Sequence, residues 1–178
     1  NYKMDVFRKT KKEATKAMKV IGVKEFDFLN IPATRLNELP VSELNNLLDK
    51  KIMSFKPNIV FSPFPDRHID HKLIFNSIMV VTRPIKKYNF IELLAAYETL
   101  SETHWNAPAI EPIFTPNWFI NIDEEINLKL KALKCYKSQI NNENYSRSLE
   151  AVKSLANFRG SQNGCKYAEA FQIIRKLN

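Results

Sequence analysis

Hydrophobic residues recur along this chain with two periods, one typical of amphipathic helices and one typical of strands. Helices are predicted at residues 6–21, 42–55, 72–83, 123–140, 149–160 and 167–177, and strands at residues 25–29, 58–62, 91–97 and 117–122. Up to Tyr97, a helix followed by a strand occurs three times. This alternation is typical of a parallel sheet covered by helices on both faces. The pattern therefore predicts an α/β fold with a mostly parallel sheet.

Four residues are predicted to begin or end helices. Gly22 follows the first helix and Gly160 the fifth, and glycine readily adopts the backbone conformation found just after a helix. Ser42 and Asp123 precede apolar periodic segments, and their side-chain oxygens can accept hydrogen bonds from the free backbone N–H groups of a first turn. We therefore expect Ser42 and Asp123 to be N-caps.

A long irregular segment, residues 98–116, separates the third predicted strand from the fourth. It contains three prolines together with Thr103 and Trp105. Loops of this length in compact domains are usually functional. Thr103 and Trp105 could line a substrate pocket, or Trp105 could cover the edge of the core. The sequence leaves both interpretations open.

Length and composition are those of a single globular domain. The chain has 178 residues, 44% hydrophobic and 26% charged, and we expect residues 1–178 to form one domain. No apolar run approaches the roughly 20 residues that a membrane-spanning helix needs. Cys135 and Cys165 are the two cysteines and lack metal-binding spacing. We interpret both as reduced packing residues and expect a cytoplasmic protein.

The net charge of +8 comes largely from one segment. Residues 1–24, which include the first predicted helix, carry eight basic and two acidic side chains. Such a helix can attract nucleic acid, an anionic membrane or a phosphorylated substrate. Lysines on one side with Ala14, Ala17, Met18 and Ile21 on the other are also typical of a solvated amphipathic helix. We favour this second interpretation and expect no nucleic-acid partner.

The densest group of titratable side chains follows the predicted strand 58–62. Two of the three histidines, His68 and His71, lie here with the carboxylates of Asp66 and Asp70. In an open parallel sheet the carboxyl ends of strands meet at the edge where ligands bind. Two imidazoles three residues apart at a helix start can face one cavity, and Asp70 can fix the tautomer of one of them. Alternatively, the histidines are capping or surface residues, and Asp70 is only an N-cap.

The motif Asp66-Arg67-His68-Ile69-Asp70-His71 belongs to a series that extends along nearly the whole chain. The further motifs are Tyr97-Glu98-Thr99, Phe114-Thr115-Pro116-Asn117, Lys131-Ala132-Leu133, Tyr136-Lys137-Ser138-Gln139, Arg159-Gly160 and Tyr167-Ala168-Glu169-Ala170-Phe171. In order and spacing this series resembles the LmbE/PIG-L-like zinc-dependent N-deacetylases. The resemblance implies a Rossmann-like three-layer fold and hydrolysis of the acetamide of an N-acetylglucosamine-type amino sugar in a glycoside, nucleotide sugar or lipid-linked form.

The resemblance also implies roles for individual residues. His71 corresponds to a zinc ligand, His68 to the general acid or oxyanion stabiliser, and Asp70 to the residue that orients His68. Asp66 and Arg67 would shape the rim of the site. The expected substrate-binding residues are Asp66, Arg67, Tyr97, Thr103, Trp105 and Arg159.

The sequence departs from the family pattern in one important respect. Family members open with a strand and an HPDD-type motif that supplies two further zinc ligands and the general base, and this chain has no such motif. A catalytic zinc usually has three protein ligands. We therefore expect the first strand-helix-strand unit and the remaining ligands upstream of residue 1, in a parent polypeptide of which this chain is a remainder. A truncated gene, or a domain that binds sugar without catalysis, would also explain the pattern.

Losing a central strand would leave an unpaired sheet edge, which is an aggregation hazard. We therefore expect a homo-oligomer or another partner to cover it.

Overall fold

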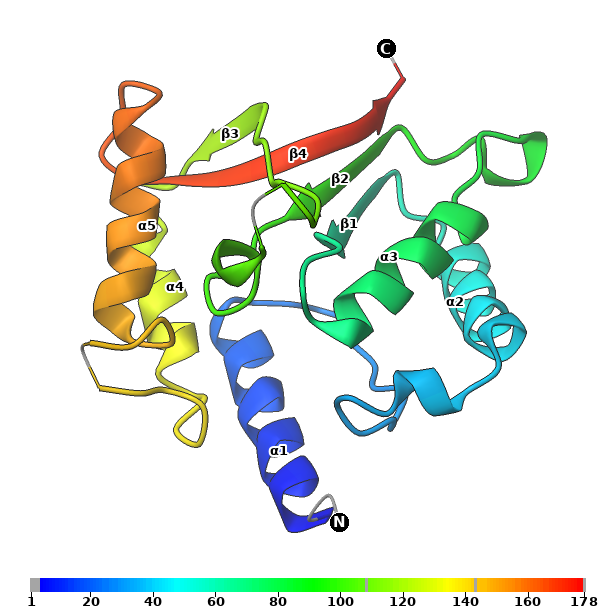
Figure 1. Cartoon of the computed structure of the whole chain (residues 1–178), viewed down its shortest axis with the longest axis horizontal. Helices are drawn as coiled ribbons and strands as arrows, with labels where there is room; N and C mark the ends of the chain where they lie inside the picture. The colour runs from blue at the N-terminus through cyan, green and yellow to red at the C-terminus, as the bar shows by residue number, and fades with distance from the viewer. Residues whose placement is uncertain (1–3, 108, 143, 178) are drawn as a thin grey trace. The chain divides into compact units, whose positions relative to one another are not determined.

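Four strands and five α-helices form the described part of the chain, which in the computed structural model comprises residues 4–107, 109–142 and 144–177 (Figure 1). The helices are α1 (Met4–Val20), α2 (Val41–Phe55), α3 (Ile69–Val81), α4 (Ile126–Leu133) and α5 (Leu149–Ser161), and the strands are β1 (Ile59–Pro63), β2 (Leu93–Tyr97), β3 (Trp118–Asn121) and β4 (Ala168–Lys176). Lys3 of the basic segment and Pro108 of the predicted loop lie outside the described residues. No helix among the described residues is long and apolar enough to cross a membrane.

The sheet is mixed, with strand order β1-β2-β4-β3. Strands β1 and β2 are parallel, with Ile59 opposite Leu93. Strand β4 runs antiparallel to β2, and the register shifts between Leu94 and Ala95. The α/β class is confirmed, but the predicted mostly parallel character holds for only one of these two strand pairs.

The chain packs as two compact units. One comprises residues 1–32 and 119–169, and the other comprises residues 33–118 and 170–178. Each unit has its own cluster of buried apolar side chains. That residues 1–178 fold as a single domain stays a prediction.

In the second unit, α2 and α3 pack against the first two strands. Val60 of β1 and Leu94 of β2 share a cluster with Ile78 and Val81 of α3, and Leu48 and Ile52 of α2 pack against it. Burying such side chains contributes about 1.5–3 kcal/mol each. This packing fixes the end of β1 relative to the start of α3, which is where the histidines lie.

In the first unit, helices α4 and α5 share a smaller cluster formed by Ile122, Ile126, Ala156 and Tyr167. Helix α1 is fastened separately by a buried carboxylate. Glu13 accepts hydrogen bonds from the backbone nitrogen of Ser138 at 3.0 Å and from its hydroxyl at 2.6 Å. The segment that follows α4 is therefore attached to α1 by polar contacts.

Two sequence-based assignments are wrong. Residues 25–29 form no strand, and the side chains of Phe26 and Leu29 are exposed. A strand needs a neighbouring strand for its backbone groups, and this segment is not part of the described four-stranded sheet. Residues 167–177 contain the strand β4 rather than a helix. Residues 171–176 of this segment pair with β2, and Ala168 and Ala170, which alternate along the same strand, are buried.

The predicted helix caps also need correction. Helix α2 begins at Val41 after Pro40, so Ser42 lies inside its first turn. Asp123 does not cap α4, because its carboxylate accepts hydrogen bonds from the backbone nitrogens of Tyr167 and Lys166. Helix α4 ends at Leu133, well before the predicted residue 140. Gly22 does follow α1, with a positive φ of 75°.

An ion pair between α2 and the segment before β2 should contribute to stability in a pH-dependent way. Asp49 accepts hydrogen bonds from Lys87 at 2.8 Å and from the Tyr88 hydroxyl at 2.7 Å, and these bonds lower the pKa of Asp49. A lowered carboxyl pKa stabilises the fold above the ordinary value of about 3.9, and this contribution is lost as the pH falls through the lowered value.

We expect Asp49→Asn to lower the free energy of unfolding by about 0.5–1 kcal/mol near neutral pH, and by almost nothing once the carboxyl group is protonated. Urea denaturation at several pH values measures this. Lys87→Met removes the other partner of the same ion pair. The double variant should therefore lose less free energy of unfolding than the sum of the two single variants. An equal loss at all pH values would contradict the ion-pair explanation.

Candidate active site

The sequence motif 66–71 connects β1 to α3. Helix α3 begins at Ile69, and His68 is its N-cap. The Nδ1 atom of His68 accepts a hydrogen bond from the backbone nitrogen of Asp70 at 3.2 Å. Accepting this bond requires a lone pair on Nδ1, so the proton of the neutral ring lies on Nε2. His68 therefore presents Nε2–H as a donor.

His71 is oriented by the buried carboxylate of Asp66. The Nδ1 atom of His71 donates to Oδ1 of Asp66 at 2.8 Å, and the Asp66 residue has 0% relative exposure. Asp66 also accepts from the backbone nitrogen of His68 at 3.0 Å and from the Thr103 hydroxyl at 2.8 Å. Protonation at Nδ1 leaves the Nε2 lone pair of His71 available to a ligand.

The two imidazole rings lie side by side. Their centroids are 4.7 Å apart, and the ring planes differ by 25°. The sequence spacing predicted that His68 and His71 lie together, and the geometry agrees. One ring offers an N–H and its neighbour a lone pair, which is a combination suited to polar chemistry on a carbonyl group.

Asp70 has a different position from the one that we expected. Its carboxylate does not contact His68; Oδ2 accepts a hydrogen bond from the backbone nitrogen of Thr34 at 2.6 Å. Thr34 has a positive φ of 64°, an uncommon conformation for a β-branched residue. Oδ1 of Asp70 is buried and has no hydrogen-bond partner in the described part of the chain. Asp70 thus holds the loop around Thr34, and only its backbone N–H orients His68.

The expected rim residues divide into buried and exposed ones. Asp66 is fully buried rather than at the rim, because three donors surround it. The guanidinium of Arg67 lies 5.9 Å from the ring centroid of Trp105. Trp105 is 58% exposed, so it does not cover the edge of the core. Arg67 of the motif and Trp105 of the loop after β2 form an accessible cation–π pair.

Asp66 accepts a hydrogen bond from Thr103, and its negative charge acts on the phenol of Tyr97. Thr103 is buried, and its hydroxyl donates to Asp66 while accepting from the backbone nitrogen of Thr99 at 2.8 Å. Its contacts are those of a positioning residue. Tyr97 ends β2, where partial burial and, secondly, the negative charge of Asp66 raise the pKa of its phenol. Tyr97 therefore stays protonated and can donate a hydrogen bond at neutral pH.

Arg159 belongs to the other compact unit, on α5. It is buried, donates to the Gln162 side chain at 3.2 Å, and lies over the ring of Phe158. These contacts describe a structural role within the helix. Its assignment to substrate binding stays a prediction.

Comparison with known proteins finds a family that is similar to the first part of the chain. Residues 2–82 match the family described as "PIG-L: GlcNAc-PI de-N-acetylase". The matched segment includes His68, Asp70 and His71. This match covers somewhat less than half of the chain, and within it the chain is similar to the PIG-L family.

Proteins similar to this chain include a curated protein and solved structures. The chain is 25% identical over 171 residues to a diacetylchitobiose deacetylase of Thermococcus kodakarensis, with 91% of the chain and 61% of the relative covered. The N,N'-diacetylchitobiose deacetylase from Pyrococcus horikoshii is 24% identical with a TM-score of 0.70, covering 92% of this chain and 62% of that one. The chain thus spans about three-fifths of the length of either deacetylase.

A similar fold also occurs in a protein that is described as a hydratase. GalB, a 4-carboxy-2-hydroxymuconate hydratase from Pseudomonas putida KT2440, is 16% identical with a TM-score of 0.76, covering 98% of this chain and 75% of that one. At this identity the likeness concerns the fold. The fold by itself therefore does not decide the reaction.

The zinc that the resemblance implies requires more ligands than the described residues supply. His71, with Nδ1 bound to a carboxylate and Nε2 free, has the form of a metal ligand. Across residues 4–107, 109–142 and 144–177, however, no three His, Cys, Asp or Glu side chains are grouped to hold a metal ion. A catalytic zinc site usually has three protein ligands. The described residues therefore do not complete a zinc site.

Asn106 and Glu111 help to organise this site and were not predicted from the sequence, whereas Thr103 was predicted to line the pocket. The loop after β2 is fastened to the motif by three side chains: Thr103 bonds Asp66, Asn106 accepts from the backbone nitrogen of Arg67 at 2.7 Å, and Glu111 pairs with Lys72 at 2.9 Å. The hydrogen bond from Lys72, with one from Ala107, lowers the pKa of Glu111. The only sequence signal was the length of the loop.

Proposed function

We propose that this chain is a hydrolase that removes the N-acetyl group from an N-acetylglucosamine-type amino sugar. The observation that carries the proposal is the stacked pair His68 and His71, with His71 oriented by the buried Asp66. This pair lies inside the segment that matches a family of de-N-acetylases. The hydratase likeness is weaker in sequence, at 16% identity against 25% for the deacetylase relative.

The residues fit the proton and charge requirements of amide hydrolysis. Water adds to the acetyl carbon, negative charge develops on the carbonyl oxygen, and the carbon–nitrogen bond breaks with a proton delivered to the amine. The Nε2–H of His68 is a donor that can stabilise the developing oxyanion. The protonated phenol of Tyr97 is a second donor near the same carboxylate. We propose the exposed Arg67 and Trp105 pair as a surface for the sugar.

We further propose zinc as the cofactor, with His71 as one ligand. The support is the carboxylate-bound form of its imidazole and the family that residues 2–82 match. The described residues by themselves do not complete the ligand set of such a metal.

Acetate release tests the proposed reaction. The protein is assayed with added zinc on N-acetylglucosamine glycosides, with intact mass and bound metal measured on the same sample. We expect acetate release that disappears in His71→Ala. The matched control is His104→Ala, because the Nε2 atom of His104 lies 3.0 Å from the carboxylate of Glu98 rather than beside Asp66. The proposal would be rejected if a chain with the mass calculated from the printed sequence neither binds zinc nor releases acetate.

A second candidate is a non-catalytic sugar-binding or scaffold domain of the same fold. The observation that favours it is the incomplete ligand set of the described residues. Sugar binding without acetate release in the same assay would support this candidate.

We also propose that a partner covers the outer edge of β1. This strand pairs with β2 and lies at one end of the sheet order of the described residues. Light scattering during size-exclusion chromatography measures whether a second copy supplies the edge partner.

Both cysteines are free, which supports our proposal of a reducing, cytoplasmic location.

A further inference from the structure

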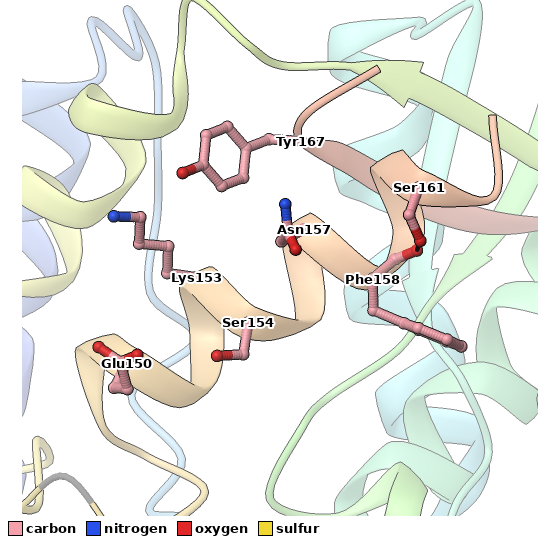
Figure 2. Close-up of a pocket in the computed structure, with 7 residues that line it drawn as sticks. All are labelled: Glu150, Lys153, Ser154, Asn157, Phe158, Ser161 and Tyr167. Carbon is pink, nitrogen blue, oxygen red and sulfur yellow. Dashed lines mark hydrogen bonds between the residues drawn. The ribbon is translucent and has the colours of Figure 1, made fainter. Parts of the chain in front are cut away.

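The turn between α5 and β4 contains the one asparagine of the chain that is followed by glycine, Asn163-Gly164. Figure 2 shows Ser161 on the last turn of α5 and Tyr167 on the segment that follows, both beside a groove of about 480 Å³. Asn163 and Gly164 are both exposed. Solvent water therefore reaches the side chain of Asn163 and the backbone of Gly164.

The backbone nitrogen of Gly164 is unobstructed. A β-carbon would shield this nitrogen from the preceding side chain, and glycine has none. A β-carbon placed on Gly164 would meet no atom within 4 Å apart from its chain neighbours, so the surrounding space is open as well. The N–H of Gly164 donates no hydrogen bond to any described residue. This nitrogen is therefore available as a nucleophile toward the side-chain amide of Asn163.

The amide of Asn163 is held at the carboxyl end of α5. Its Nδ2 atom donates to the backbone oxygen of Arg159 at 3.1 Å. The backbone oxygen of Gly160 accepts hydrogen bonds from the backbone nitrogens of Asn163 at 2.9 Å and of Cys165 at 3.2 Å. The last carbonyl groups of a helix lack partners within the helix, so these bonds complete its end. Asn163 thus supplies two of the donors that finish α5.

We propose that Asn163 is a site of spontaneous deamidation. The backbone nitrogen of Gly164 attacks Cγ of Asn163, a new carbon–nitrogen bond forms, and Nδ2 leaves as ammonia together with the proton of the Gly164 N–H. The resulting cyclic succinimide then takes up a water molecule. Opening of one or the other of its carbonyl–nitrogen bonds gives aspartate or isoaspartate at this position. Water is the only co-reactant, and nothing is oxidised or reduced.

The modification changes the end of α5 in two ways. A carboxylate cannot donate to the backbone oxygen of Arg159, and its negative charge lies where the partial charge of the helix is already negative. Isoaspartate also inserts a β-carbon into the main chain of the turn. The backbone of this turn lies so close to Gly160 that a β-carbon on that residue would have no room. Deamidation should therefore destabilise the connection between α5 and β4.

Peptide mapping by mass spectrometry tests the proposal on the folded protein, incubated in a mildly alkaline buffer while circular dichroism follows its folded state. We expect aspartate and isoaspartate to accumulate at Asn163 faster than at Asn89, which is also exposed but is followed by Phe90. Gly164→Ala should slow the reaction about tenfold, equivalent to a barrier higher by about 1.4 kcal/mol, because alanine shields its own nitrogen and is less flexible.

The variant Asn163→Asp tests the consequence for stability separately. We expect it to raise the equilibrium constant of unfolding about 2- to 10-fold, because a donor is lost and a charge is added at the helix end. Asn89→Asp adds the same charge at an exposed residue outside α5 and is the matched control. Urea denaturation of both variants measures the difference. Equal stability of the two variants would contradict the role of Asn163 at the end of α5.

Three further outcomes would overturn the proposal. The first is modification of Asn163 no faster than that of Asn89, and the second is an unchanged rate in Gly164→Ala. The third is formation of aspartate without isoaspartate, because direct hydrolysis of the side chain gives aspartate alone. The proposed deacetylation does not enter this test, since the turn and the motif 66–71 belong to different compact units. His71→Ala should therefore lose acetate release and deamidate like the unaltered chain.

Discussion

Replacing Asp66 by alanine should lower the free energy of unfolding by about 3–5 kcal/mol. The carboxylate is fully buried and accepts hydrogen bonds from His71 at 2.8 Å, from the His68 backbone at 3.0 Å and from Thr103 at 2.8 Å. Alanine would leave these donors without an acceptor in a site closed to water. Chemical denaturation monitored by circular dichroism measures the loss.

The same variant should release the tautomer of His71. With Asp66 in place, the imidazole proton is held on Nδ1; without it, nothing described fixes the proton there. Nitrogen NMR of the imidazoles reads this change directly. Asp66→Asn should cost less stability than the alanine variant, because its amide oxygen can still accept from His71 while its nitrogen faces Thr103.

Asp5→Ala is the control for the loss of a carboxylate, because the Asp5 side chain is 97% exposed. Its effect should stay within about 0.5 kcal/mol. A small loss in Asp66→Ala, with an unchanged His71 tautomer, would contradict the positioning role of Asp66.

Local signals explain how much of the fold could be predicted from the sequence. The periodic apolar residues of α1, α2, α3 and α5 and the apolar runs of β1 and β2 are properties of neighbouring residues, and these elements lie near their predicted places. Segment 167–177 carried two patterns. Tyr167, Phe171 and Ile174 have helical spacing, while Ala168 and Ala170 alternate as in a strand. Pairing with β2, which is distant in sequence, decided for the strand.

The candidate site shows the same division between local and distant contacts. The proximity of His68 and His71 follows from their spacing at a helix start, and the sequence predicted it. The partners of the carboxylates do not follow from spacing. Asp66 contacts Thr103 and Asp70 contacts Thr34, each more than thirty residues away. The sequence therefore suggested a contact between the Asp70 carboxylate and the neighbouring His68. In the structure this carboxylate accepts a hydrogen bond from the backbone nitrogen of Thr34 instead.

The second large effect should come from Gly160→Ala. The sequence predicted that Gly160 ends its helix, but α5 continues to Ser161, and the glycine is buried within the helix. A β-carbon at this position would lie 2.6 Å from the backbone carbon of Lys166 and 2.7 Å from the backbone oxygen of Cys165. These are backbone atoms, which cannot move aside without shifting the turn that leads into β4.

Helix propensity alone would make alanine more favourable than glycine here by about 1 kcal/mol, so the sign of the effect discriminates between the two explanations. We expect the clash to dominate and to lower the free energy of unfolding by about 1–3 kcal/mol. Gly164→Ala is the matched control: its β-carbon would meet nothing within 4 Å, but its positive φ of 72° should cost about 1 kcal/mol. Denaturation of both variants measures these losses. The close approach of residues 165–166 to α5 leaves no room for a β-carbon at position 160. Equal stability of Gly160→Ala and the unaltered chain would therefore contradict this close approach.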